Sequence, residues 1–181
     1  MKNVLAILLL AALVSGCGFN QTDKRVSDEK QELIKAEKSV QQDTTPRVTG
    51  IGGIFFKSPN PQKIRGWYGD NLGLAVNDFG SPFEFRNANN PDEINYLMWS
   101  PTTDSTDYFL PSEKEFMINY RVVNIEGMVR NLKKNGVKVL DEIVEYKYGK
   151  FVHLMDPDGN KIELWEPVDS VLTDMGGKTT K

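Results

Sequence analysis

Short runs of apolar residues recur along the chain with two kinds of spacing, and the same order of runs occurs twice. Each copy starts with an alternating run typical of a strand, continues with a run of helical spacing, and ends with further strand-like runs. The first copy predicts a strand at 48–57, a helix at 61–72 and strands near 74–78, 82–86 and 94–100. The second copy predicts a strand at 116–123, a helix at 125–134 and strands at 137–140, 143–148 with 151–155, and 161–165. The pattern therefore indicates two consecutive βαβββ units of about 55 residues each.

Residues that favour turns set the ends of the two expected helices. Pro61 suits a first helical turn, Gly73 follows the last apolar residue of the first helix, and Asn135-Gly136 ends the second. Neither unit can bury both faces of its sheet alone, so the two units are expected to share one core. The predicted fold class is α+β, with two βαβββ repeats forming curled mixed sheets around a shared cleft and the helices packed outside.

The N-terminus has the features of an export signal. Lys2 supplies a positive charge, residues 5–14 form an apolar run, and small residues lead into Cys17. The run is shorter than the roughly 20 apolar residues of a membrane-spanning helix. The residues before Cys17 resemble the lipobox of bacterial lipoproteins, which implies cleavage after residue 16 and acylation of Cys17, including an amide-linked chain such as palmitate. The alternative is an ordinary cleaved signal followed by an incidental cysteine.

The remaining chain divides by composition into a tether, one domain and a tail. Residues 17–47 are mostly polar and are expected to form a spacer that holds the domain away from the membrane, with a partner-binding helix as the alternative. Residues 48–167 are enough for one domain with a core, and residues 168–181 are expected to be a frayed polar tail. The predicted location is the bacterial cell envelope, facing the periplasm or the cell exterior.

Charge and cysteine usage exclude some classes of function. The 22 Lys and Arg residues fall to 21 once Lys2 is removed with the signal, which against 25 acidic residues leaves a net charge of −4. This balance argues against a nucleic-acid partner, so attachment to the membrane is expected through the lipid on Cys17. Cys17 is the only cysteine, so the chain can form no internal disulfide.

Two segments carry a resemblance to a known family. Gly52-Gly53-Ile54-Phe55-Phe56 precedes a helix that contains Trp67-Tyr68, and an Asp156-Pro157-Asp158-Gly159-Asn160 turn leads into Ile162-Glu163-Leu164. Over residues 48–167 the chain resembles the glyoxalase/bleomycin-resistance family of the vicinal oxygen chelate superfamily. The resemblance implies a paired βαβββ fold with a divalent metal in the cleft, and in metal-dependent members the glutamate at the position of Glu163 is a ligand.

The other ligand positions of the family do not carry over to this chain. Gly53 and Met117 stand where the first strand of each repeat usually has a histidine, and 97–99 contains neither histidine nor carboxylate. A site built on imidazole and carboxylate groups needs about three protein ligands, whereas the chain has one histidine. A divalent metal held by Glu163 and His153 with waters stays open, and the cofactor is otherwise unknown.

The alternation of side chains along strands predicts a polar cleft. Residues that share a face with Met117 or Gly53 are expected to point into it. These residues are Lys57, Phe55, Asn119 and Arg121. Together with Glu163 they predict that an anionic or zwitterionic small molecule is bound by charge-assisted hydrogen bonds. The alternative is that Lys57 and Arg121 lie at strand ends and extend to solvent.

The orientation of His153 depends on the turn that follows it. A tight turn with Asp156 and Gly159 as its corners would pair His153 with Ile162, away from Glu163. One more loop residue would bring His153 to the face of Glu163, and this arrangement is favoured because the family commonly has a cavity-lining residue there. His153 and Glu163 are then the candidate catalytic residues, His153 as a general base or hydrogen-bonding group. The alternative is a histidine packed on aromatic rings without a chemical role.

Three functions follow, in decreasing order of support. The first is a lipid-anchored protein that binds a small organic molecule without a metal, with 108–110 of the inter-repeat linker as a lid over the cleft. The second is a metal-dependent lyase, isomerase or dioxygenase of the glyoxalase type. The third is a non-catalytic envelope scaffold. A homodimer stays open in each case.

Overall fold

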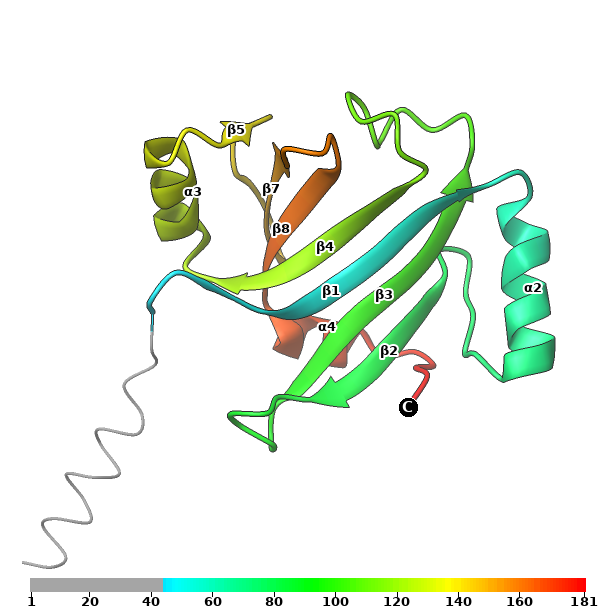
Figure 1. The fold of residues 1–181 in the computed structure, drawn as a ribbon. Coiled ribbons are helices and arrows are strands. Elements are labelled where there is room, and N and C mark those ends of the chain that lie inside the picture. Colours follow the sequence, from blue (N-terminus) through cyan, green and yellow to red (C-terminus); the bar gives the residue numbers. More distant parts are fainter. Residues whose placement is uncertain (1–43) are drawn as a thin grey trace, which may run out of the picture. The chain divides into compact units, whose positions relative to one another are not determined.

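The computed structural model describes residues 44–181, and the predicted signal peptide, Cys17 and nearly all of the tether lie outside them. Figure 1 shows the course of the described chain. Its elements are β1 (Arg47–Ser58), α2 (Pro61–Leu72), β2 (Ser81–Arg86), β3 (Ile94–Thr103), β4 (Phe116–Val123), α3 (Ile125–Lys134), β5 (Lys138–Val139), β6 (Val144–Tyr146), β7 (Gly149–Met155), β8 (Lys161–Pro167) and α4 (Asp169–Met175). No helix within 44–181 combines the length and apolar character needed to cross a membrane.

The strands form one open, curled, eight-stranded sheet. Its order is β2-β3-β1-β4-β8-β7-β5, with β6 also paired to β7. The two halves repeat the same pairing, since β1 is parallel to β3 and β4 is parallel to β8, and each of these partners has an antiparallel neighbour beyond it. The predicted repeat and the α+β class are confirmed. The two expected sheets are joined into one, because β1 and β4 pair antiparallel at the centre.

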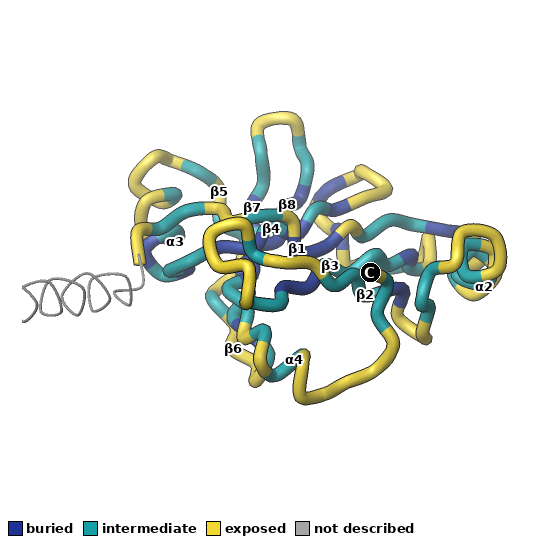
Figure 2. The backbone as a smooth tube through the Cα atoms, turned by 90° about the horizontal axis from the view of Figure 1, so that it is seen from below, coloured by how far each residue is buried: buried dark blue, intermediate teal, exposed yellow. Residues whose placement is uncertain are grey.

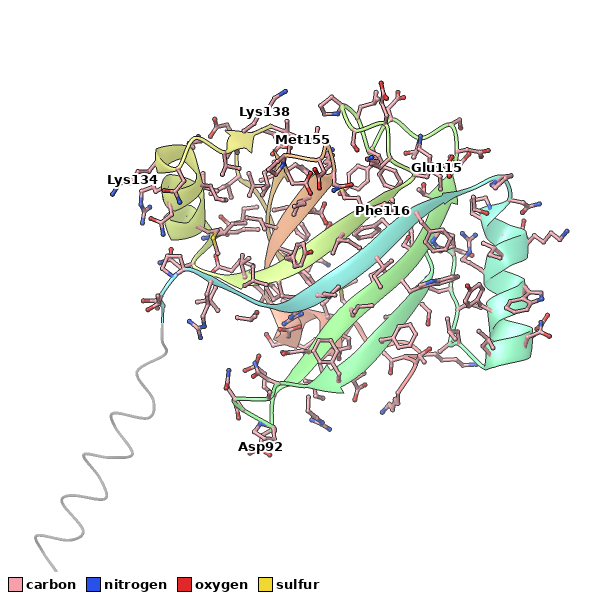
Figure 3. The ribbon with its side chains drawn as sticks, viewed as in Figure 1. Asp92, Glu115, Phe116, Lys134, Lys138 and Met155 are labelled. Carbon is pink, nitrogen blue, oxygen red and sulfur yellow. The ribbon has the colours of Figure 1, made fainter. Side chains whose placement is uncertain are left out.

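Both predicted helices are present with the predicted boundaries. Asn60 caps α2 by accepting a hydrogen bond from the Lys63 backbone N–H at 2.9 Å, and Gly73 ends that helix at a φ of 73°. In α3 the side chain of Asn124 accepts from the Gly127 N–H at 2.9 Å. Figure 3 shows Lys134, in the last turn of α3, extending away from the sheet. Basic residues at this end favour the helix, because its C-terminus carries partial negative charge.

The first repeat has one strand fewer than predicted. Residues 74–78 form no strand, and their backbone groups find local partners and one partner at the C-terminus. The Ala75 N–H donates to the Thr180 hydroxyl at 2.8 Å, and the Ser81 hydroxyl donates to the Ala75 carbonyl at 3.2 Å. The distant Thr180 thus meets hydrogen-bonding needs that a neighbouring strand was expected to meet.

Helices α2 and α3 pack on one face of the sheet, as predicted. On this face Trp99 of β3 contacts Tyr68 of α2 and Phe56 of β1, with ring centroids 4.5 and 5.4 Å apart. The second half has a core that joins α3 to β4, β7 and β8. Its buried members are Val122, Ile125, Val129, Val152, Leu154 and Leu164. Because side chains alternate along each strand, the intervening residues of β4, β7 and β8 point to the opposite face, called the site face below.

Helix α4 covers part of the site face, which the sequence analysis did not predict. Residues 168–181 were expected to fray, but Asp169–Met175 form a helix and Thr180 pairs with β2 through its N–H to the Pro82 carbonyl at 2.8 Å. The Glu84 N–H returns a bond to the Thr180 carbonyl at 2.9 Å. Figure 2 shows α4 and the exposed segment after it on one side of the strands, with the C-terminus returning to β2. The tail is therefore part of the fold.

Two of the three glycines of β1, Gly52 and Gly53, make room for the protein's own side chains. A Cβ at Gly52 would lie 2.2 Å from Asn119 Oδ1 and 2.8 Å from Trp165 Cε3. A Cβ at Gly53 would lie 2.7 Å from the ring of Phe55. Side chains of the site face thus approach these glycines closely, and a larger residue at either position would displace them.

Candidate functional site

Five strands align one residue each in a row across the site face. The pairing sets Met98, Gly53, Asn119, Glu163 and His153 side by side on β3, β1, β4, β8 and β7. Partners in register project to the same face, so the row brings Asn119 and His153 to either side of Glu163. This row is the centre of the candidate site.

The turn after β7 decides the orientation of His153. Met155 pairs with Lys161, which leaves a five-residue loop at 156–160. The carboxylate of Asp156 holds this loop by accepting from the N–H groups of Asp158 and Asn160 at 2.9 and 2.8 Å. His153 therefore pairs with Glu163, and the favoured alternative of the sequence analysis is confirmed for its orientation.

Glu163 is a buried carboxylate whose two oxygens are both hydrogen-bonded. Its residue is 3 % exposed. Oε2 accepts from Asn119 Nδ2 at 2.5 Å, whereas Oε1 accepts from the Tyr108 hydroxyl and lies 3.0 Å from His153 Nε2. Removing a carboxylate from water is costly unless such partners compensate. Three side chains of the protein supply this compensation.

His153 lies between two carboxylates. Its Nδ1 is 2.6 Å from Asp141 Oδ2, and its Nε2 faces Glu163. Burial on its own would lower the pKa of His153, but the hydrogen bonds to Glu163 and Asp141 outweigh this and raise it above the ordinary value. A neutral imidazole can donate to only one partner, whereas an imidazolium donates to both. The arrangement favours the protonated form, which can act as an acid or a hydrogen-bond donor but cannot accept a proton.

Asp141 is a site residue that was not predicted, and Tyr108 was predicted only as part of a lid. Asp141 follows β5, and its carboxylate also accepts from the His153 backbone N–H at 2.8 Å. Tyr108 belongs to the predicted lid, and burial followed by the nearby charge of Glu163 raises the pKa of its hydroxyl, which therefore stays protonated as a donor. The strand predicted at 137–140 ends just before Asp141. Had its pairing with the strand of His153 been predicted as well, Asp141 would have been placed near the site.

Two adjoining hollows open on the site face. The smaller has a volume of about 310 Å³ and is lined by Phe55, Tyr108, Asp141, Val144, Tyr146, Tyr148, Phe151, His153 and Glu163. The larger has a volume of about 740 Å³ and lies between the sheet and the C-terminal segment; Asn119, Met98, Tyr96 and Leu172 are among its lining residues. Phe55, Tyr148, Phe151 and Glu163 line both. Volumes of this order are those of small-molecule sites.

The predicted cationic residues do not line either hollow. Arg121 shares the site face, as expected, but its guanidinium pairs with Asp169 of α4 and donates from Nη1 to the Tyr96 carbonyl at 3.0 Å. Lys57 Nζ lies 5.9 Å from the centroid of the Phe109 ring. Of the four residues expected to bind the ligand, Phe55 and Asn119 line a hollow, and Lys57 and Arg121 have other partners.

The donor set of the site does not fit the metal that the family resemblance implies. Within residues 44–181 no three His, Cys, Asp or Glu side chains gather closely enough to hold an ion. In the central row, Gly53 and then Met98 occupy the positions beyond Asn119, and neither supplies an oxygen or nitrogen side-chain ligand. The one imidazole is bonded at both nitrogens to carboxylates. No chemical step through a metal is therefore derived for this site.

Solved structures with similar folds come from several bacteria. Methylmalonyl-CoA epimerase from Mycobacterium tuberculosis is 22% identical, with coverage of 70% of this chain and 93% of that chain and a TM-score of 0.46. A superfamily member from Vibrio splendidus 12B01 is 16% identical, with coverage of 67% and 99% and a TM-score of 0.40. The Mn(II)-bound glyoxalase from Novosphingobium aromaticivorans is 16% identical, with coverage of 76% and 42% and a TM-score of 0.43.

The family itself is identified by its sequence model. No curated protein matches the chain significantly. The model described as Glyoxalase/Bleomycin resistance protein/Dioxygenase superfamily matches residues 50–164, a span that runs from β1 to β8 and includes both repeats. The chain belongs to the glyoxalase/bleomycin resistance protein/dioxygenase superfamily.

Proposed function

We propose that this protein is a lipid-anchored protein of the bacterial cell envelope that binds a small polar organic molecule on the site face without a metal ion. The observation that carries the proposal is the state of Glu163. Its carboxylate lies where the two hollows meet, and donors from Tyr108, His153 and Asn119 already surround it. These donors hold the carboxylate in place without a cation.

The same geometry supports binding over catalysis. General-base chemistry needs a group that can accept a proton from the substrate. His153 is engaged at both ring nitrogens, and Glu163 would have to release one of its three donors to act. The competing function is a glyoxalase-type lyase, isomerase or dioxygenase, which would use Glu163 and His153 as metal ligands. It would need further ligands from water or substrate, since the described residues offer no third one.

The anchor rests on the sequence of the N-terminus. Cleavage before Cys17 and acylation of this residue would place the domain outside the cytoplasmic membrane, joined to the lipid by the polar residues up to 47. The domain then meets molecules of the envelope or the surroundings. Binding at that place suits capture or sequestration of a small molecule.

Mass spectrometry of the protein purified in detergent from its host's envelope tests both parts. Under denaturing conditions we expect a chain that begins at acylated Cys17. Under native conditions we expect an additional organic mass of up to a few hundred daltons, in keeping with the hollow volumes. The Met98→Trp variant, which enlarges a side chain lining the larger hollow, should lose that mass. An unacylated Cys17 would refute the anchor, and a wild-type chain carrying no organic mass would refute the binding proposal.

A further inference from the structure

We propose that the smaller hollow selects an organic cation, a substituted ammonium group whose apolar portion extends into the larger hollow. This inference rests on the proposed function and specifies its ligand class. It replaces the anionic ligand expected from the sequence. Four features of the site face support it: aromatic walls, an excess of carboxylates, the positions of the nearby lysine and arginine side chains, and continuity with an apolar chamber.

Aromatic rings form most of the wall. Tyr146 and Tyr148 stack with centroids 5.4 Å apart and planes 2° apart. Phe151 stands edge-on to both, at 5.9 and 5.7 Å. Tyr108 and Phe55 add two further rings, edge-on to each other at 6.4 Å. Ring faces carry partial negative charge, so a group of rings around a hollow attracts an ammonium group.

The charged groups that line the smaller hollow are predominantly acidic. Asp141 and Glu163 contribute two negative charges, and His153 between them contributes at most one positive charge. Glu163 is buried and fully engaged, but the Asp141 side chain is 44 % exposed and can approach a ligand. An ammonium group between Asp141 and the tyrosines would gain an ion pair as well as contacts with the rings.

Lys161, Arg121 and Lys57 have partners of their own and do not line the smaller hollow. Lys161 Nζ donates to the Tyr108 backbone carbonyl at 2.6 Å and does not line either hollow. Arg121 is paired with Asp169, and Lys57 lies over Phe109. In the smaller hollow an anionic group would therefore face two carboxylates without a lysine or arginine partner, whereas a cationic group meets no lysine or arginine there. Arg86 and Lys181 line the larger hollow, where Glu84 is also part of the wall and lies 3.6 Å from Lys181 Nζ.

The larger hollow accounts for the rest of the ligand. It adjoins the smaller one through Phe55, Tyr148 and Phe151. Beyond them its walls include Leu97, Met98 and Leu172. An alkyl or aromatic substituent on the ammonium nitrogen would be buried there, with a gain of about 0.8 kcal/mol for each CH₂ group removed from water. The favoured ligand is therefore an amphipathic cation.

Matched probes separate the effect of charge from that of shape. The probes are hexyltrimethylammonium against heptanoate, and choline against the uncharged isostere 3,3-dimethylbutan-1-ol. Binding to the Cys17→Ser protein is followed through the NMR signals of His153, the only histidine of the chain. We expect each cation to bind about tenfold tighter than its matched probe, as for a partly desolvated cation–aromatic contact. Hexyltrimethylammonium should bind tighter than choline.

Variants then locate the binding site. Asp141→Asn and Tyr146→Leu change exposed side chains of the smaller hollow, and each should weaken hexyltrimethylammonium binding by about fivefold or more. Glu142→Gln is the matched control, because it removes the adjacent carboxylate, which is 92 % exposed, and should leave binding unchanged. Equal or tighter binding of heptanoate or the alcohol, no binding of any probe, or an equal loss in Glu142→Gln would overturn the inference. The organic mass carried by the isolated protein judges the proposed function separately.

Discussion

Replacing Asp169 with alanine is expected to lower the free energy of unfolding by about 3–5 kcal/mol, as is typical when one partner of a buried ion pair is removed. Arg121 is 3 % exposed and lies between the rings of Trp165 and Phe85, at 5.2 and 5.9 Å. Without Asp169 its guanidinium keeps the hydrogen bond to the Tyr96 carbonyl and the contacts with the two rings, but loses the one carboxylate that it pairs with among residues 44–181. Urea denaturation of the Cys17→Ser protein measures the loss.

Asp174→Ala is the control for this prediction. Asp174 lies on the same helix and is exposed, so its removal should change the unfolding free energy by no more than about 0.5 kcal/mol. A second variant, Arg121→Met with Asp169→Ala, should recover part of the stability because no unpaired charge stays buried. If Asp169→Ala and Asp174→Ala have equal effects, the C-terminal helix is not held by Arg121.

The single histidine is expected to titrate above the ordinary value of about 6.5. Hydrogen bonds to Glu163 and Asp141 raise the pKa of His153 against the effect of its burial. Asp141→Asn and Glu163→Gln should therefore each lower that pKa, and the double variant, in which burial dominates, should titrate below 6.5. An NMR titration of an untagged chain observes one histidine signal and needs no assignment.

The same shift makes stability depend on pH. Because the pKa of His153 is higher in the folded than in the unfolded chain, its contribution to stability is complete below about pH 6.5 and is lost as pH rises through the folded value. Urea unfolding between pH 5.5 and 9 should show this loss in the native protein and a smaller one in Asp141→Asn. A pKa of His153 at or below 6.5 in the native protein would contradict hydrogen bonding of a protonated His153 to both Asp141 and Glu163.

Patterns of local spacing predicted most of the fold. The repeat of strand and helix periods gives β1, α2, β4 and α3 with nearly their observed bounds. No strand forms at 74–78, where the Ala75 N–H donates instead to the side chain of Thr180, more than a hundred residues away. Local periodicity carries no information about such a partner.

The candidate site was also predictable where local spacing determines it and not where distant residues meet. Strand alternation placed Asn119, Arg121 and Glu163 on one face, and the register confirms this. It could not show that Arg121 would be neutralised, because Asp169 comes from a segment too polar to signal a helix. Asp141 was missed for a related reason, since a loop residue reaches His153 only through the pairing of distant strands. Figure 3 places Lys138 beside Met155, where β5 pairs with β7 and carries the chain toward this loop.

The metal content of the purified protein tests the central claim most directly. The claim is that Glu163 is held by Tyr108, His153 and Asn119, and that the site face binds its ligand without a metal. After exposure to Mn, Fe, Ni and Zn followed by dialysis, we predict far less than one ion per chain, with no difference between the native protein and Glu163→Gln. One ion per chain that is lost in Glu163→Gln would contradict the claim and favour a glyoxalase-type enzyme.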